Sequence, residues 1–319
     1  MKIALHRLPF TPAQTAELRA IATDAGHEAR WFPDDAPSTF GALADCEALM
    51  GYFPPELLAR LPKLRWVQLP SAGAEKYCAA LRSRPEVQLC NCSGAFGVAI
   101  AEYMLAGALM LLRRMPAYHS NQRARRWACM GEGRTIFGSE IALLGAGDVG
   151  GQFAARAKAL GAHVRGVRRS GAPDPERFDA IYPPERVCEA VRGADVIAAC
   201  LPDAPGTRGL ISADCFAAMR PDAIFVNCGR GATVDEAALI RALRAGKLGG
   251  AVLDVFSVEP LPAESPLWEM ENVIVTPHIS GRDGDPLNRD AIFSIFCENL
   301  RRYLRGEPLA HAVHPARGY

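Results

Sequence analysis

The sequence predicts an α/β protein with two doubly wound parallel-sheet domains. Short apolar runs alternate with helical patterns along the chain, as in repeated strand–helix–strand units of a parallel sheet. A glycine-rich turn at residues 145–150 stands between one apolar run and a helical pattern, which is typical of a nucleotide-binding domain of this class. The length of 319 residues suits two domains of roughly 150 residues each.

The first series of elements covers the N-terminal part of the chain. A strand is expected at 3–5, followed by a helix at 11–25 with Pro12 near its first turn, where proline is tolerated. Apolar runs predict the remaining elements of this part, which are strands at 29–32, 48–52, 66–69 and 87–90 and a long helix at 97–114.

The second series begins after a polar, arginine-rich stretch at 122–134. Its strands are apolar throughout, as strands covered by helices on both faces must be. Gly246 ends a helix at 235–244. A final helix at 290–305 has apolar residues at helical spacing and is expected to pack on the N-terminal domain. The other expected elements are strands at 141–144, 164–167, 196–200, 224–227, 251–254 and 273–276, a helix from the glycine turn to 160, and a helix near 184–191.

Composition and charge exclude several classes of protein. Lys and Arg number 36 against 35 Asp and Glu, so the formal net charge of +1 provides no field to hold nucleic acid or an anionic membrane. The apolar stretch 98–112 is too short for a bilayer span and contains Glu102, which favours a buried helix. The N-terminus turns polar before a signal-peptide core could form. We therefore expect a cytoplasmic protein without nucleic-acid or membrane partners.

The ten cysteines are spread along the chain without a Cys-x-x-C pair, which favours reduced, buried thiols. Cys90 and Cys92 form the closest pair, and no second Cys/His cluster with zinc-site spacing accompanies them. We therefore expect no metal site.

The glycine-rich turn has the pattern G-x-G-x-x-G. The first glycine turns the chain, the second lets the backbone approach a pyrophosphate, and the third admits close helix–strand packing. Backbone N–H groups and the helix dipole then supply the anion site that the net charge does not. The expected cofactor-binding residues of this loop are Gly145, Ala146, Gly147, Asp148, Val149 and Gly150.

The end of the next strand indicates which dinucleotide binds. An NAD site places an acidic residue about 20 residues further on, where it accepts hydrogen bonds from the ribose. Here the strand runs into Arg168, Arg169 and Ser170, and the first carboxylate is Asp174. Because a planar guanidinium group matches phosphate oxygens, we predict a preference for NADP over NAD. Solvated loop arginines are the alternative interpretation.

Three residues with catalytic potential follow strand ends of the second series. They are Arg230, Glu259 and His278, in the segments 226–231, 254–260 and 276–281. The carboxyl ends of parallel strands face the ligand crevice, so these side chains are expected to converge there. Taken singly, each has an ordinary alternative: Arg230 as a surface cation, Glu259 as a solvated acid and His278 as a histidine in a turn. Together with the dinucleotide loop they indicate an active site.

These segments resemble the D-isomer-specific 2-hydroxyacid dehydrogenase family. The resemblance spans nearly the whole chain and includes the glycine loop and the segments 98–103, 201–211, 226–239, 254–260 and 277–278. It implies a Rossmann-type NAD(P)-binding domain, residues 94–281, inserted into a flavodoxin-like substrate-binding domain of residues 1–93 and 282–319. It also implies a homodimer, and the two arginines after the second strand favour the glyoxylate/hydroxypyruvate reductase members.

The resemblance implies hydride transfer from the cofactor to a small 2-keto acid, with roles for the three residues. His278 is the general acid that protonates the carbonyl oxygen. Glu259 holds the imidazole ring and favours its charged form. Arg230 binds the substrate carboxylate and polarises the carbonyl. In the first domain, Ala72 and Gly73 match the loop whose backbone amides hold the same carboxylate.

Several other candidate site residues also have a structural interpretation. Tyr52 and Phe53 are candidates for the side-chain pocket, with core packing as the alternative, and Trp127 is a weaker candidate. Asp254 matches the carboxylate at the nicotinamide end of the cofactor, with a structural cap as the alternative. The resemblance implies cofactor contacts outside the glycine loop from Leu201, Pro202, Thr207, Cys228, Asp254, His278 and Gly281.

The sequence also bears on other functions. Formate dehydrogenases of this superfamily have Gln at the position of Glu259, which argues against formate. Phosphite dehydrogenase shares the three catalytic residues and stays an alternative. A dinucleotide-sensing corepressor is a further alternative, although this chain lacks long polar tails and has the complete catalytic set. No role is assigned to Arg282 or Asp283 in the charged turn that follows His278.

Overall fold

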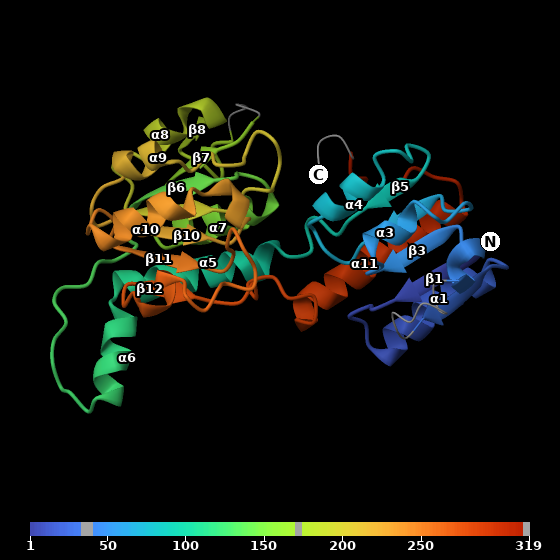
Figure 1. Ribbon diagram of the computed structural model, residues 1–319, viewed down its shortest axis with the longest axis horizontal. Coiled ribbons are helices and arrows are strands. Elements are labelled where there is room, and N and C mark those ends of the chain that lie inside the picture. Colours follow the sequence, from blue (N-terminus) through green and yellow to red (C-terminus); the bar gives the residue numbers. More distant parts are fainter. Residues whose placement is uncertain (33–40, 170–173, 315–319) are drawn as a thin grey trace. The chain divides into compact units, whose positions relative to one another are not determined.

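The computed structural model describes residues 1–32, 41–169 and 174–314, which belong to two units. One unit consists of Met1–Phe96 together with Arg282–Tyr319, and the other is Gly97–Gly281. Each unit is built on its own parallel sheet (Figure 1). The expected fold class of two parallel-sheet α/β domains is therefore confirmed.

The described strands of the first unit form one sheet of five, in the order β2-β1-β3-β4-β5, and all neighbours are parallel. The chain adds β2 on one side of β1 and then β3 on the other side, so the strand order reverses between β1 and β3. Ligands of such sheets bind at the carboxyl ends of the strands beside the reversal. The strands are β1 (Lys2–His6), β2 (Glu28–Phe32), β3 (Ala48–Gly51), β4 (Trp66–Gln68) and β5 (Gln88–Cys90).

The last long helix of the chain belongs to the first unit, as expected. It is α11 (Pro286–Leu304), which packs against α1 (Pro12–Asp24). It begins four residues earlier than its apolar pattern indicates, because Asp285 caps its N-terminus. The buried amide of Asn299 donates to Oε1 of Gln68 at 2.7 Å and so links α11 to the sheet. The other helices of this unit are the 3₁₀ helix η1 (Ala42–Asp45), α3 (Pro55–Leu58) and α4 (Glu75–Ala80).

The described strands of the second unit form a parallel sheet of seven, in the order β12-β11-β10-β9-β6-β7-β8. The order reverses between β6 and β9, which is the arrangement of dinucleotide-binding domains with one further strand at the edge. The strands are β6 (Glu140–Leu144), β7 (His163–Val167), β8 (Ala180–Tyr182), β9 (Val196–Ala199), β10 (Ile224–Asn227), β11 (Gly250–Leu253) and β12 (Val273–Val275).

Helices cover both faces of this sheet, which explains why its central strands are buried throughout. A Cβ atom at Gly107 of α5 would lie 2.7 Å from the side chain of Val252, so glycine lets α5 approach β11 closely. The helices are α5 (Gly97–Leu112), α6 (Met115–Arg123), α7 (Asp148–Ala159), η2 (Pro184–Arg186), α8 (Val187–Ala190), α9 (Ala213–Ala218), η3 (Gly231–Thr233), α10 (Glu236–Arg244) and η4 (Pro266–Glu269).

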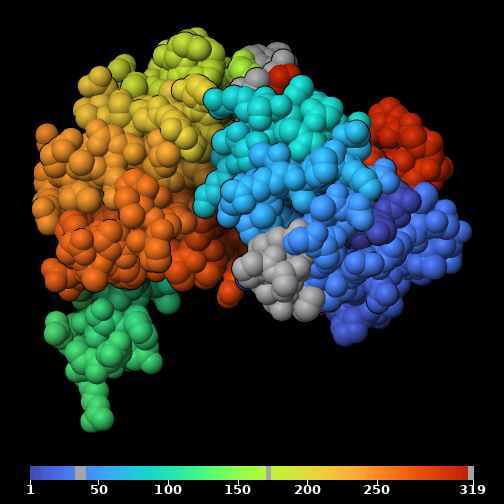
Figure 2. Space-filling model, turned by 45° about the vertical axis from the view of Figure 1, so that its right-hand side comes forward, coloured from blue at the N-terminus to red at the C-terminus, as the bar shows by residue number. Residues whose placement is uncertain are grey.

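Helix α6 and the residues after it stand out from the body of the second unit (green in Figures 1 and 2). We call residues 115–133 the arm. Asn121 is the one buried residue of α6, and all residues of this helix are described. Trp127, in the irregular part of the arm, is fully exposed. The sequence did not predict α6 because the helix has no apolar stripe.

Among the described residues, none of the helices combines the length and the apolar character that a membrane span requires. All ten cysteines are free thiols, and most of them are buried.

Candidate active site

The glycine loop lies between β6 and α7, where the conformation of each glycine has a distinct reason. Gly145 has φ +107°, a region that favours glycine, and the carbonyl group of Cys200 lies beside it. A Cβ atom at Gly150 would lie 2.2 Å from the carbonyl oxygen of Gly145, so the third glycine allows α7 to start close to β6. A Cβ atom at Gly147 would meet no atom within 4 Å.

The protein itself therefore gives no steric reason for glycine at 147. This is the position where a pyrophosphate needs to approach the backbone, next to the N-terminus of α7. Ala146 is buried, and the carboxylate of Asp148 lies against Gly97, where burial raises its pKa. The loop fits a dinucleotide, because the space above it is open and the N–H groups of a helix start there.

The residues expected to bind a 2′-phosphate follow β7. The backbone N–H of Arg168 donates to Tyr182, and its guanidinium group lies 3.6 Å from the carboxylate of Asp174. The same carboxylate pairs with Arg177 at 2.8 Å. Arg169 lies beside Arg168 at the carboxyl end of β7, whereas Ser170 lies outside the described residues.

The segment after β9 is held as a tight turn. The Thr207 hydroxyl donates to the carbonyl of Pro202 at 2.5 Å and accepts from the N–H of Ala204 at 3.0 Å. Leu201 is buried and packs against Gly229, where a Cβ atom would lie 2.6 Å from the Leu201 backbone. This turn and Cys228, which follows β10, thus lie together at the carboxyl edge of the sheet.

His278 and Glu259 form a hydrogen-bonded pair. Nδ1 of His278 lies 2.9 Å from Oε2 of Glu259, and the other carboxylate oxygen accepts from the N–H of Phe256 at 3.0 Å. The Glu259 side chain is thus fixed on both oxygens. The expected contact between these two residues is present within the second unit.

Arg230 lies on the neighbouring segment. A Cβ atom at Gly231 would lie 1.9 Å from the carbonyl group of Phe256, so glycine at 231 lets the two segments pack directly against each other. The Arg230 side chain donates to the carbonyl of Gly229 at 2.8 Å, and its own carbonyl accepts from the Thr233 hydroxyl at 2.7 Å. The segments that carry Arg230, Glu259 and His278 follow the adjacent strands β10, β11 and β12.

The fully buried carboxylate of Asp254 organises the turn that carries His278. It accepts from the Thr276 hydroxyl at 2.6 Å and from the backbone N–H groups of Ile279 and Ser280, both at 2.8 Å. These bonds hold His278 with φ 53°, a left-handed conformation that is uncommon for a non-glycine residue. Both oxygens are engaged, which fits the structural cap considered from the sequence.

Tyr103 extends this network and was not anticipated. Its hydroxyl lies 2.5 Å from Oγ1 of Thr276. Because Thr276 gives its hydrogen to Asp254, Tyr103 is the donor to Thr276. Burial raises the pKa of Tyr103 to about 12, which keeps this donor protonated. The two residues are 173 positions apart, so no sequence spacing connects them.

In the first unit, the turn after β4 contains Ala72 and Gly73. The Ser71 hydroxyl donates to the carbonyl of Gly73 at 2.8 Å, and the amide of Asn91 donates to the carbonyl of Ala72 at 2.7 Å. The N–H of Cys92 donates to the carbonyl of Ser71 at 2.9 Å. Three successive carbonyl groups of the turn are thus hydrogen-bonded, which fixes its shape.

The two pocket candidates after β3 differ. Phe53 is buried in the core, with its ring centroid 5.2 Å from that of His6, which supports the alternative that it is a core residue. The Tyr52 hydroxyl donates to the carboxylate of Asp283 at 3.2 Å. Asp283 is thus a partner that the sequence did not identify.

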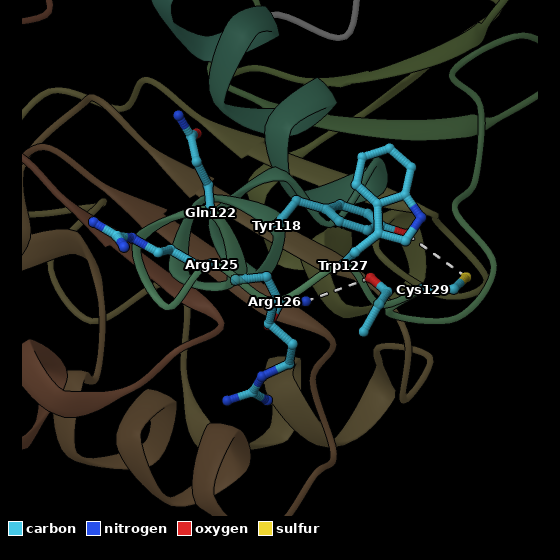
Figure 3. A pocket seen from close by; sticks show the side chains of 8 residues that line it. Tyr118, Gln122, Arg125, Arg126, Trp127 and Cys129 are labelled. Atoms are coloured by element: carbon cyan, nitrogen blue, oxygen red, sulfur yellow. Dashed lines mark hydrogen bonds between the residues drawn. The ribbon is translucent and has the colours of Figure 1, made fainter.

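Trp127 lines a hollow made by arm residues alone. Figure 3 shows Tyr118 and Trp127 on one side of this hollow and the guanidinium groups of Arg125 and Arg126 on the other. None of the residues expected to be catalytic lines it. Among the described residues, no group of three or more His, Cys, Asp or Glu side chains is placed to hold a metal ion.

Comparisons with known proteins show what the chain is similar to. The sequence profile of the D-isomer specific 2-hydroxyacid dehydrogenase NAD-binding domain matches residues 105–280. An (S)-sulfolactate dehydrogenase from Chromohalobacter salexigens is 35% identical over 254 residues, which cover 78% of this chain and 80% of the relative. A glyoxylate/hydroxypyruvate reductase B from Citrobacter koseri is 31% identical over 327 residues, which cover 98% of this chain and 94% of the relative.

Solved structures are similar over the full length. A D-isomer specific 2-hydroxyacid dehydrogenase from Xanthobacter autotrophicus, in complex with NADPH and MES, superimposes with a TM-score of 0.82 at 31% identity. The match covers 100% of this chain and 99% of that chain.

Proposed function

Because the chain belongs to the D-isomer specific 2-hydroxyacid dehydrogenase family, it is an NAD(P)-binding oxidoreductase, and we propose that it reduces glyoxylate, hydroxypyruvate or a similarly small 2-keto acid to the D-2-hydroxy acid. The hydrogen bond between Glu259 and His278 carries this proposal, since an imidazole paired with a carboxylate is suited to protonate a carbonyl oxygen. The relatives are named as dehydrogenases and reductases, so phosphite oxidation and corepression are not favoured.

The proton is given by His278. Its Nδ1 is bonded to Glu259, so Nε2 is the atom that donates to the carbonyl oxygen as negative charge builds there. Glu259 fixes the ring and stabilises its positive charge. Arg230 binds the substrate carboxylate through its planar guanidinium group and polarises the carbonyl. Ala72 and Gly73 hold the same carboxylate through their backbone N–H groups.

The dinucleotide, when bound, supplies the hydride that reduces the carbonyl carbon. The loop Gly145, Ala146, Gly147, Asp148, Val149 and Gly150 and the N-terminus of α7 hold its pyrophosphate. We assign Asp254 the role of a positioning residue for the His278 turn, because its oxygens are engaged there. The remaining residues proposed along the cofactor are Leu201, Pro202, Thr207, Cys228 and Gly281.

We propose that the enzyme prefers NADPH to NADH. Arg168 and Arg169 at the end of β7 support this, because two guanidinium groups suit the 2′-phosphate. Arg168 pairs with the carboxylate of Asp174, and the 2′-phosphate would replace this carboxylate as the negative partner of Arg168. We propose the hydroxyl group of Ser170 as a third donor to the 2′-phosphate. The NADPH in the Xanthobacter autotrophicus relative also supports this preference.

We further propose that the enzyme is a cytoplasmic homodimer in which residues 94–281 bind the cofactor and residues 1–93 with 282–319 bind the substrate. The arm supports association with a second copy, because its fully exposed Trp127 and half-exposed Met115 present apolar surface to water. Association through the arm would join the nucleotide-binding units.

The decisive experiment is the variant His278→Ala, assayed with glyoxylate and hydroxypyruvate. Loss of the general acid should lower kcat by roughly 10²–10⁴-fold. NADPH binding, measured by fluorescence titration, should be retained, since the glycine loop is untouched. Unchanged turnover in this variant would refute the mechanism. A panel of 2-keto acids with NADPH and NADH then identifies the preferred pair.

A further inference from the structure

A polar pair lies at the ligand-binding edge of the first unit. Tyr52 donates to Oδ2 of Asp283 at 3.2 Å, and the Ser71 side chain lies beside the same phenol. Burial, followed by the charge of Asp283, raises the pKa of Tyr52 well above its usual value. The phenol therefore remains a donor throughout the working pH range.

The strand order places this pair where a ligand is expected. The sheet order reverses between β1 and β3, and Tyr52 directly follows β3. Its N–H donates to the carbonyl of His6, the last residue of β1, at 3.2 Å. Tyr52 thus bridges the carboxyl ends of the two strands that flank the reversal, which is the ligand crevice of such sheets.

Asp283 is held in a defined position by the start of α11. The fully buried Asn288 donates its amide to the carbonyl of Arg282 at 2.8 Å, and Asp285 caps the helix. Among the described residues, Asp283 forms no ion pair, and its side-chain partner is the uncharged Tyr52. The pair therefore presents a negative group to this edge.

The turn proposed to bind the substrate carboxylate is adjacent. Ser71, whose side chain lies beside the Tyr52 phenol, directly precedes Ala72 and Gly73. A substituent on the third carbon of a 2-keto acid is two carbons from its carboxylate, and so comes close to Tyr52 and Asp283 when the carboxylate occupies this turn.

We infer that Tyr52 and Asp283 select the substituent on the third carbon of the substrate. The carboxylate accepts a hydrogen bond from an uncharged hydroxyl group there and repels an anionic group such as a sulfonate or a phosphate. Hydroxypyruvate is then favoured over 3-sulfopyruvate, which has the same keto acid portion. This inference rests on the proposed reduction of 2-keto acids and names the substrate class of that site.

The first test uses the unmodified enzyme with NADPH. The kcat/KM for hydroxypyruvate should exceed that for 3-sulfopyruvate by at least about tenfold, since a like charge in the site opposes binding. Equal or faster turnover of 3-sulfopyruvate would overturn the inference. Glyoxylate has no third carbon and serves as the separate test of the proposed function. Failure to reduce any of the three acids contradicts that function, whereas glyoxylate turnover without discrimination contradicts only the inference.

The second test uses variants. Asp283→Asn removes the charge but keeps an oxygen for Tyr52, so the preference for hydroxypyruvate over 3-sulfopyruvate should fall about tenfold. Tyr52→Phe keeps the charge, so 3-sulfopyruvate should remain disfavoured. Asp24→Asn is the matched control, because it removes an exposed carboxylate at the end of α1 and should leave the ratio unchanged.

A ratio in Asp283→Asn within twofold of the parent, with an unchanged melting temperature, would overturn the inference. If Asp283→Asn does not fold, the preference for hydroxypyruvate over 3-sulfopyruvate in the parent enzyme and in Tyr52→Phe still tests the inference. Acceptance of 3-sulfopyruvate by Tyr52→Phe at the rate of hydroxypyruvate would assign the discrimination to the phenol and contradict a role for the charge.

Discussion

Oε2 of Glu259 lies 2.9 Å from Nδ1 of His278. The second carboxylate oxygen accepts from the N–H of Phe256, so the Glu259 side chain cannot turn away from the imidazole without breaking a further bond. The ring is thereby oriented with Nε2 directed away from Glu259, as a general acid requires.

The variant Glu259→Gln tests this pair. The amide can keep one hydrogen bond to His278 but has no charge to stabilise the imidazolium. We expect kcat for glyoxylate to fall by about 10–100-fold. Fluorescence titration should give the parent dissociation constant for NADPH, because the glycine loop is unchanged. A kcat within twofold of the parent would show that the carboxylate charge is dispensable.

The variant Asp254→Asn tests the turn that carries His278. One amide oxygen cannot replace two carboxylate oxygens that accept three hydrogen bonds, so a backbone N–H at Ile279 or Ser280 loses its partner. We expect the free energy of unfolding to drop by about 2 kcal/mol, measured by urea titration. Thr276→Val removes the bond to Asp254 and also the acceptor of the Tyr103 hydroxyl, so it should cost a similar amount, about 2 kcal/mol. Equal stability of parent and Asp254→Asn would contradict this account.

Tyr103 should contribute to stability in a pH-dependent manner. Burial raises its pKa to about 12, whereas an unfolded tyrosine titrates near 10. The stabilising contribution is therefore complete below about pH 10 and is lost as the pH rises through the folded pKa. Tyr103→Phe has no phenol to ionise, so its stability deficit at pH 8 should shrink or reverse by pH 11.5. Thermal melting of both proteins across this range checks the prediction, and a deficit that stays constant with pH would argue against it.

The variant Arg168→Ala tests the cofactor preference. Loss of a charge-assisted bond to the 2′-phosphate should raise KM for NADPH by about tenfold or more and leave KM for NADH nearly unchanged. Arg186→Ala removes an exposed arginine that pairs with Glu189 on the same unit and serves as the control. Equal effects on both cofactors would indicate that Arg168 is a solvated loop residue.

The variant Trp127→Ala tests association through the arm. If Trp127 is an anchor residue at a dimer interface, its truncation should weaken the dimer by about 2 kcal/mol, or roughly 30-fold in the dissociation constant. Light scattering over a dilution series measures this change. Trp268→Ala removes another exposed tryptophan of the same unit and is the control. A parent protein that is monomeric at all concentrations would contradict the dimer.

The sequence predicted the long, strongly patterned elements well. Buried strands such as β9, β10 and β11 appear as apolar runs because helices cover both faces. Short helices such as α4 and α9 have only six residues, too few to establish a helical period. Helix α6 was missed for another reason, since its polar and charged surface resembles that of a loop.

The candidate site was predictable where the signal is local. The glycine loop and the strand-end positions of Glu259 and His278 are visible along the chain, because parallel strands deliver their carboxyl ends to one edge. Contacts between distant segments were not predictable. The Tyr52–Asp283 bond connects positions 231 residues apart, and the Thr276 hydroxyl that bonds Asp254 looks from the sequence like an ordinary residue before a proline.

The division of the first unit into two chain segments has a consequence for synthesis on the ribosome. Residues 97–281 are contiguous and can fold as soon as they emerge, whereas the five-stranded sheet must wait for α11 before its buried Gln68 acquires the partner Asn299. The strand β5 likewise gains its bridge to Ala312 only after the second unit has been made. The nascent N-terminal segment therefore exposes apolar surface for the whole time that the second unit is being made, which makes it the part of the chain where chaperone binding is expected first.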